Sequence, residues 1–275
     1  MTHTLMTLIG CAVLAGGQTI QETMAALPLP THEAGQAKAG TLRPVVVQGS
    51  DAGAPFVIND NGIRTSFRIV NLENRTAEYL IQFLTPKGEP LEFPLEEKGA
   101  VSALRGTIAP NSMLELRSTG AGGTVLGWAV LVGPAARIAT QVSIQTRYAD
   151  GSWHSTSHHG ANAVVKRVKA PYDNRGGYAT SVLFANPNSE DVGLTVVIRD
   201  AKGEVLARQT YLLAGSHSYS IPLVKQFPAT EGGTGTVEFA IPAGSTLGFP
   251  AVSLRVHERG AIELLDALTL TDWAN

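Results

Sequence analysis

The chain has 275 residues, of which 44% are hydrophobic and 16% charged, and it contains 29 glycines and 15 prolines. Its 21 basic and 23 acidic residues form no long run of either sign, so a surface for nucleic acid is not expected. The single cysteine, Cys11, excludes a disulfide framework and a zinc site built on cysteines.

The N-terminal apolar stretch runs from Leu5 to Gly17. It is too short to span a bilayer but has the length of a signal-peptide core, so residues 1–17 are expected to be an export signal. Small residues at Ala15 and Gly17 suit ordinary signal peptidase, whereas residues 8–11 (Leu-Ile-Gly-Cys) resemble a bacterial lipobox, which implies lipidation of Cys11. A cytoplasmic chain that begins with an apolar strand or helix is the third open interpretation.

Residues 18–43 are rich in Ala, Thr, Gln, Gly and Pro without periodicity, which is typical of a flexible tether. No later run approaches the ~18 apolar residues of a transmembrane helix. Membrane attachment is therefore expected only through a lipid at Cys11.

An internal repeat begins after the tether, with a constant offset of 115 residues. Residues 62–91 align without gaps over residues 177–206. The identical residues are Gly62 and Gly177, Thr65 and Thr180, Ser66 and Ser181, Asn71 and Asn186, the Lys-Gly-Glu of 87–89 and 202–204, and Leu91 and Leu206. We expect two tandem copies of one domain, at residues 44–159 and 160–275, with about ten extra residues in the first copy before Ala109.

Each copy has the pattern of short strands. Apolar residues alternate at Tyr79, Ile81 and Phe83 and again at Leu194, Val196 and Ile198, which is the period of a half-buried strand. Polar breaks with glycine follow at residues 85–88 and 200–203 and indicate hairpin turns. Further strands are expected at residues 113–116, 125–132, 138–148, 235–241 and 251–257, and Trp128 is expected in the core. This rhythm favours two Ig-like β-sandwiches and an all-β fold.

The second copy also resembles a family. Gly176-Gly177-Tyr178, Thr180, Asn186-Pro187 and Ser189, followed by Asp200, Gly203 and Leu206, are similar to the tandem β-sandwich repeats of uncharacterised secreted bacterial proteins. Residues 127–129 (Gly-Trp-Ala) and 148–151 (Tyr-Ala-Asp-Gly) look like further motifs of these repeats. The first copy departs from the pattern at Ile63 and Leu72. The resemblance implies an exported sandwich protein and no particular activity.

Three histidines, His154, His158 and His159, are candidates for a metal site, whereas the aspartates in turns, Asp51, Asp60, Asp173 and Asp200, lack the repeated spacing of known calcium loops. Along a strand, His154 and His158 would share a face about 13 Å apart, too far for one ion unless a turn intervenes. The alternative is a solvent-exposed edge between the domains. We therefore expect no metal and no cofactor.

No set of residues supplies a nucleophile, a base and an orienting group, so catalysis is not expected. Trp153 and Trp273 lie in turn or terminal contexts and are the candidates for contact with a ligand. The basic residues Lys166, Arg167 and Lys169 fit alternating exposed positions of the second domain's first strand.

Two functions remain. The chain is expected to be a non-catalytic extracytoplasmic interaction module of the bacterial cell envelope, secreted, periplasmic or lipid-anchored, that binds a protein or matrix partner through loops or strand edges. The alternative is a protein that binds extracellular polysaccharide, which requires Trp153 or Trp273 to be exposed beside polar groups.

Overall fold

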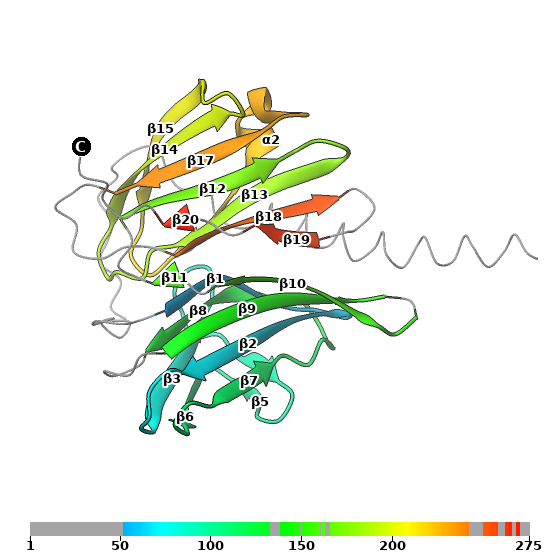
Figure 1. Cartoon of the computed structure of the whole chain (residues 1–275), viewed down its shortest axis with the longest axis vertical. Coiled ribbons are helices and arrows are strands. Elements are labelled where there is room, and N and C mark those ends of the chain that lie inside the picture. Colours follow the sequence, from blue (N-terminus) through cyan, green and yellow to red (C-terminus); the bar gives the residue numbers. More distant parts are fainter. Residues whose placement is uncertain are drawn as a thin grey trace, which may run out of the picture.

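The computed structural model describes residues 52–132, 138–148, 150–159, 161–162, 166–241, 250–257, 262–265 and 268–269. Almost all regular structure in these ranges is β-strand (Figure 1). The helical segments described there are a short α-helix, α2 (Leu223–Gln226), and a 3-10 turn, η1 (Pro228–Thr230). The all-β class predicted from the sequence is confirmed.

The first half of the molecule comprises the strands up to Asn162. They are β1 (Ala52–Asn59), β2 (Ile63–Asn71), β3 (Ala77–Leu84), β4 (Phe93–Leu95), β5 (Gly99–Val101), β6 (Ala103–Ile108), β7 (Met113–Arg117), β8 (Val125–Val132), β9 (Ile138–Arg147), β10 (Trp153–His159) and β11 (Ala161–Asn162). They form one sheet of order β11-β1-β8-β3-β6, a second of order β10-β9-β2-β7 and the hairpin β4-β5. Because β11 pairs with β1, the first half extends past residue 159, where the sequence pattern places the boundary.

The second half comprises the strands from Arg167 onward. They are β12 (Arg167–Asp173), β13 (Tyr178–Ala185), β14 (Val192–Asp200), β15 (Val205–Leu213), β16 (Ser218–Pro222), β17 (Thr234–Ala240), β18 (Ala251–His257), β19 (Ile262–Leu265) and β20 (Leu268–Thr269). Their sheets have the orders β20-β12-β17-β14-β15 and β19-β18-β13-β16. Strand for strand, these orders match the two larger sheets of the first half, with β12 in the place of β1 and β13 in the place of β2.

The alternating apolar residues of β3 and β14 face the interiors of the two halves, as predicted. They are Tyr79, Ile81, Phe83, Leu194, Val196 and Ile198, each at most 6% exposed. The predicted turns follow, with φ of +83° at Gly88 and +86° at Gly203. Residues with a Cβ rarely adopt this conformation, which explains why glycine stands at both positions.

Repeated residues also make the same backbone contacts in the two halves. The Thr65 hydroxyl donates to the Ile58 carbonyl at 2.8 Å and accepts from the Ile58 N–H at 2.9 Å. Thr180 makes the same two bonds to Asp173, at 3.1 and 3.2 Å. Ile58 and Asp173 are themselves 115 residues apart, so the offset of the sequence repeat also relates these contacts.

The extra residues before Ala109 include the β4-β5 hairpin, which has no counterpart among the described residues of the second half. Phe93 is fully buried, and its ring stacks on Phe83 with the centroids 4.8 Å apart. Leu95 joins the same core, and the Glu96 N–H donates to the Arg117 carbonyl at 2.9 Å. The hairpin therefore enlarges the core of the first half and is tied to β7.

Trp128 is only 1% exposed, as expected, but it lies outside the core of the first half. Alternation along β8 sends Ala129 and Leu131 into that core, so Trp128 projects from the opposite face of the strand. There it packs with Ala185 of the second half, and its Nε1 donates to the Thr85 carbonyl at 3.0 Å. The predicted burial of Trp128 is thus confirmed, but the residue lies in the contact between the halves rather than in the interior of the first half.

A larger apolar cluster joins the halves beside Trp128. Its buried members are Phe56, Ile58, Ile63 and Ile144 of the first half and Leu183, Val252, Leu254, Val256, Ile262 and Leu264 of the second. The five-stranded sheet of the first half thus lies against the four-stranded sheet of the second, and the four large sheets are stacked in layers (Figure 1). Because this contact is apolar and extensive, it holds the halves in a fixed arrangement.

Candidate functional site

The histidine-rich segment forms β10, an edge strand of the first half. His154 is exposed, whereas His158 is only 4% exposed. In the register with β9, His154 lies opposite Thr146 and His158 opposite Val142, so the two histidines share a face about 13 Å apart. The solvent-exposed edge predicted from the sequence therefore holds at His154 but not at His158.

The other predicted site residues are distributed differently. His159 ends β10, and Cys11 and Trp273 lie outside the described residues. Within the part of the chain that the structure describes, no group of three His, Cys, Asp or Glu side chains is placed to hold a metal ion.

Trp153 begins β10 and is half-buried on the face of the strand opposite to His154. The guanidinium carbon of Arg64 lies 4.0 Å from the centroid of its ring, a cation–π contact that covers one face. Arg64 is fixed in turn by Gln145 at 2.6 Å and by Glu96 at 2.8 Å. At Gly120 a Cβ would lie 2.8 Å from the indole ring, so only glycine leaves room for Trp153. The indole is thus held rigidly beside polar groups.

The turn between β9 and β10 brings more aromatic side chains to the same end of the sheet. The Gly151 N–H donates to the Tyr148 carbonyl at 2.9 Å, and Asp150 accepts from the N–H and hydroxyl of Ser152 at 2.8 and 2.6 Å. Tyr148 is 38% exposed and meets His154 edge to face, with ring centroids 5.8 Å apart. The β9-β10 hairpin therefore carries Trp153 on one side and an aromatic pair on the other.

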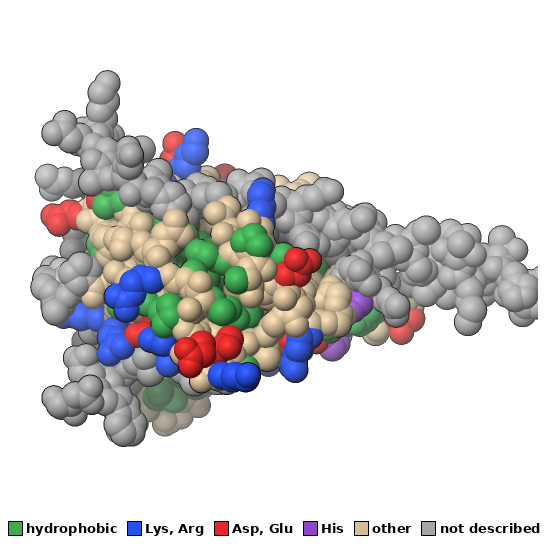
Figure 2. All heavy atoms as spheres, turned by 90° about the horizontal axis from the view of Figure 1, so that it is seen from above, with side chains coloured by type: hydrophobic (Ala, Val, Ile, Leu, Met, Phe, Trp, Pro, Cys, Tyr) green, Lys and Arg blue, Asp and Glu red, His purple; other side chains and the backbone are tan. Residues whose placement is uncertain are grey.

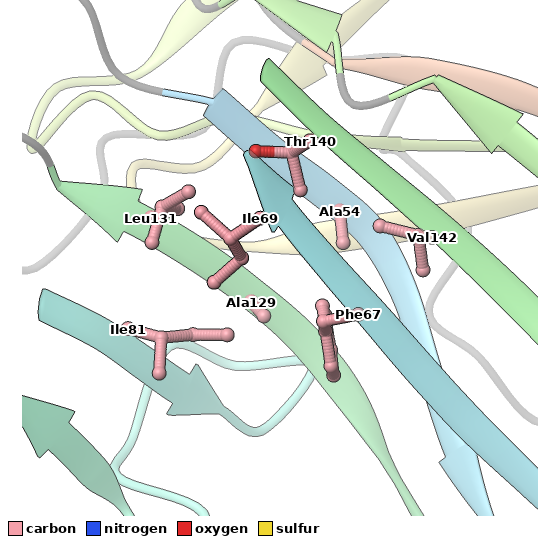
Figure 3. Close-up of a pocket in the computed structure, with 8 residues that line it drawn as sticks. All are labelled: Ala54, Phe67, Ile69, Ile81, Ala129, Leu131, Thr140 and Val142. Atoms are coloured by element: carbon pink, nitrogen blue, oxygen red, sulfur yellow. The ribbon is translucent and has the colours of Figure 1, made fainter. Parts of the chain in front are cut away.

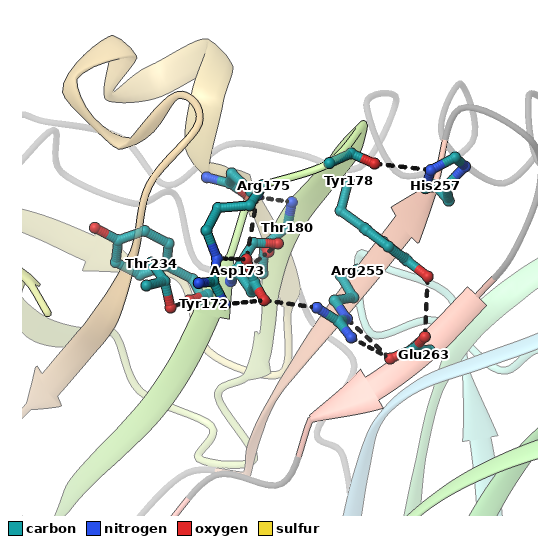
Figure 4. A network of polar contacts seen from close by, with 11 residues as sticks. Tyr172, Asp173, Arg175, Tyr178, Thr180, Thr234, Arg255, His257 and Glu263 are labelled. Carbon is teal, nitrogen blue, oxygen red and sulfur yellow. Dashed lines mark hydrogen bonds and ion pairs between the residues drawn. The ribbon is translucent and has the colours of Figure 1, made fainter.

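The second half carries a polar network (Figure 4). Arg255 donates to Asp173 at 2.9 Å and to Glu263 at 2.6 and 2.9 Å, and so joins β12, β18 and β19. The Tyr178 hydroxyl donates to Glu263 at 3.0 Å, and Arg255 lies over the Tyr178 ring at 4.3 Å. The His257 ring packs edge to face on the Tyr178 ring, with the ring centroids 4.7 Å apart.

Both carboxyl groups of the network have lowered pKa values. Hydrogen bonding from Arg175, with the nearby charge of Arg255, lowers the pKa of Asp173 to about 2. Burial alone would raise the pKa of Glu263, but hydrogen bonds from Arg255 and Tyr178 and the charges of Arg255 and His154 outweigh it and lower that pKa. The Leu264 N–H donates to the Thr156 hydroxyl at 2.7 Å, so β10 lies beside β19 of the network. Both groups are ionised acceptors, which suits fixing strands better than donating protons.

The network was not predicted because it joins two pairs of strands, β12 with β13 and β18 with β19, that lie far apart in the sequence. Arg255 and Glu263 are direct cross-strand partners, an opposite-charge pair of the kind that stabilises antiparallel strands. The sequence pattern predicts a strand at residues 251–257 but none at residues 262–265, so this pairing could not be anticipated.

The interior of the first half holds a small apolar cavity (Figure 3). Its volume is about 10 Å³, no more than one water molecule needs. Its lining residues are Ala54, Phe67, Ile69, Ile81, Ala129, Leu131, Thr140 and Val142. The cavity is therefore a packing gap of the core and offers no room for a larger ligand.

Comparison with known proteins does not assign this chain to a family. No protein-family profile and no curated protein matches it. Among solved structures, procruciferin, an 11S globulin from Brassica napus, is similar over 84% of this chain and 85% of its own, with 8% sequence identity and a TM-score of 0.23. A TM-score this low supports no statement about fold or function.

Proposed function

We propose that this chain is a non-catalytic, extracytoplasmic interaction module of the bacterial cell envelope, which binds a protein or matrix partner through the β9-β10 hairpin. In this proposal the two halves are tandem Ig-like β-sandwiches that diverged from one ancestral domain. They act as a rigid support for the hairpin.

The matching halves support the proposed duplication. The sheets have corresponding strand orders, and Thr65 and Thr180 bond the backbone in the same way. Gly127 and Gly235 are a further pair. A Cβ at either would collide with the carbonyl oxygen of the neighbouring strand, that of Leu84 or of Arg199. Leu84 and Arg199 are again 115 residues apart.

The aromatic end of the β9-β10 hairpin is the observation that carries the proposed function. Tyr148, Trp153 and His154 are gathered there and held by a tight turn, by Arg64 and by Gly120. Tyrosine, tryptophan and arginine are the residues most often found at energetic centres of interfaces, and rings already held in place lose little conformational entropy on binding.

The proposed location rests on the sequence of residues 1–17. In the described ranges the structure has no helix with the length and apolarity to cross a membrane. Palmitate labelling of the wild type and of Cys11→Ser tests the lipid anchor. Label that is lost in the variant supports it, and equal labelling excludes it.

Affinity capture from the protein's own cell envelope, followed by mass spectrometry, tests the binding role. We expect one set of partners to be retained by the wild type and lost with the double variant Tyr148→Ala and Trp153→Ala. Met113→Ala is the matched control, because Met113 is also exposed, at 55%, but lies on β7 away from the hairpin. Partners that bind all three proteins equally would contradict the proposal, provided that the variants melt as the wild type does.

Binding of extracellular polysaccharide is the second candidate. Trp153 is half-buried and Arg64 covers one face of its ring, so it meets only in part the exposure that this function requires; Gln145 and Glu96, which bind Arg64, supply polar groups nearby. A glycan array should then give binding that disappears in Trp153→Ala. An array with no binding by the wild type would remove this candidate.

A further inference from the structure

The outer face of the sheet β15-β14-β17-β12-β20 lies at the opposite end of the stack from the sheet that carries Trp153 (Figure 1). Val168 and Phe239 point into the core, so their strand neighbours Lys169 and Glu238 project outward. The register aligns Arg208 with Val197, Val197 with Glu238, and Glu238 with Lys169. One row of side chains thus crosses four strands.

Positive charge is concentrated around this row. The cross-strand positions near Val197 carry four cations and one carboxylate, which we call the basic face: Arg167, Lys169, Arg199, Arg208 and Glu238. Figure 2 looks down on this end of the molecule, where Lys and Arg side chains lie along one side with Asp and Glu side chains among them. The excess is local, because the whole chain has a formal net charge of −2.

Most of these cations are not neutralised. Arg167 pairs with Glu238 at 2.5 Å, and Arg199 donates to the Gly203 carbonyl at 3.0 Å. In the described part of the chain, no carboxylate forms an ion pair with Lys169, Arg199 or Arg208. Three cations therefore remain available to an acidic partner.

The outward face of the first half differs in this respect. There Arg64 pairs with Glu96, and Arg68 and Arg117 both pair with Glu115. Most of the arginine charge on that face is thus already compensated within the first half. The two outward faces carry similar numbers of arginines, but the electrostatic potential that an approaching anion meets is more positive at the basic face.

The basic face is also held rigidly. Val197 lies at its centre and is only 6% exposed, although it points away from the core. Its direct cross-strand neighbours are Arg208 and Glu238, and the Glu238 side chain is itself only 15% exposed. Because the cations stand on neighbouring strands, their spacing follows the ~4.8 Å separation of the sheet.

The remaining outward groups indicate the kind of acidic partner. Thr195, Thr210 and Thr236 supply hydroxyls around the cations. No aromatic ring occupies an outward position of β12, β14, β15 or β17 as described. Single-stranded nucleic acid is bound largely by stacking of its bases on aromatic side chains, which this face lacks.

We infer that the basic face binds an extended acidic polysaccharide, whose uronic-acid carboxylates pair with Lys169, Arg199 and Arg208 while its hydroxyls meet the threonines. The choice of polymer rests on the proposed extracytoplasmic location. The inference does not depend on the β9-β10 hairpin, so an experiment can contradict the proposed role of the hairpin and leave the basic face untouched, or the reverse.

Affinity electrophoresis of the purified full chain in gels that contain polygalacturonate, at a series of increasing sodium chloride concentrations, tests the inference. We expect retardation that weakens with salt, because exposed charges are screened, and none with neutral dextran. The double variant Lys169→Glu and Arg208→Glu should weaken binding by about tenfold or more. Equal binding of dextran and polygalacturonate would overturn the inference.

A matched double variant in the first half separates this site from bulk charge. Arg68→Glu and Arg105→Glu, at two exposed positions on β2 and β6, change the net charge by the same amount and should leave binding within about twofold of the wild type. If both double variants weaken binding equally, the basic face is not the site. Single-stranded DNA provides the second comparison, since tighter binding of DNA than of polygalacturonate would exclude the polysaccharide. Loss of partner capture by the hairpin variants, with polygalacturonate binding intact, would leave this inference standing.

Discussion

Asn71 and Asn186 make the same set of hydrogen bonds in the two halves. The Asn71 amide donates to the carbonyls of Arg75, Ile108 and Ala109 at 2.7, 3.2 and 3.0 Å. The Asn186 amide donates to those of Glu190, Leu213 and Ala214 at 2.9, 3.2 and 3.2 Å. Both side chains are 1% exposed, so each asparagine satisfies backbone groups where two turns meet.

Asn186→Ala should therefore lower the free energy of unfolding by about 1–3 kcal/mol, because buried carbonyls lose their donor. Asn71→Ala should cost a similar amount. Asn74→Ala is the control, since Asn74 is exposed in the same turn region as Asn71. Urea unfolding followed by circular dichroism gives the three values. An Asn186→Ala protein as stable as Asn74→Ala would show that these bonds contribute nothing.

The strand pattern could be predicted from the sequence because it depends on local chemistry. Alternating apolar residues and positive-φ glycines such as Gly88 and Gly203 act within a few residues of themselves. The strands expected at residues 125–132 and 251–257 have these same bounds in the structure.

The docking of the halves could not be predicted, although the aligned repeats differ at a residue of the contact between them. Arg68 aligns with Leu183, and the structure exposes Arg68 to solvent while Leu183 is fully buried against the first half. From the sequence alone, this substitution cannot be distinguished from the other differences between the two copies. The candidate site was predicted only in part for the same reason: Trp153 and His154 stand out, but Arg64 and Glu263 become their neighbours only through folding.

Trp128→Ala should destabilise the protein by about 3–5 kcal/mol, the usual cost of deleting a buried aromatic ring. Because Trp128 lies between the halves, we expect the wild type to unfold in one thermal transition and Trp128→Ala to unfold in two. Differential scanning calorimetry measures both effects. Trp153→Ala makes the same change at a half-buried site and should keep one transition. An unchanged melting profile in Trp128→Ala would contradict the role assigned to this residue.

The low pKa of Asp173 makes stability depend on pH in a defined window. Its pKa is lowered from 3.8 to about 2, so the ionised group stabilises the folded state fully above 3.8, and this contribution is lost as the pH falls toward 2. The difference in unfolding free energy between wild type and Asp173→Asn should accordingly shrink over that interval. Arg175→Gln removes the main cause of the shift and should narrow the window. A difference between wild type and Asp173→Asn that is constant from neutral pH to 2 would refute the assignment.

Gly235→Ala should be strongly destabilising, although alanine suits strands better than glycine does. A Cβ at Gly235 would overlap the Arg199 carbonyl oxygen and lie 2.9 Å from the Tyr172 ring, so the backbone of β14 or β17 must move. We expect a cost of about 1–3 kcal/mol, typical of overpacking. Gly193→Ala is the matched control, because no atom lies within 4 Å of its Cβ position. If urea midpoints of the two variants coincide, then close approach of β14 and β17 does not explain the glycine at 235. By the same argument Gly127→Ala, whose Cβ would meet the Leu84 carbonyl, should behave as Gly235→Ala does.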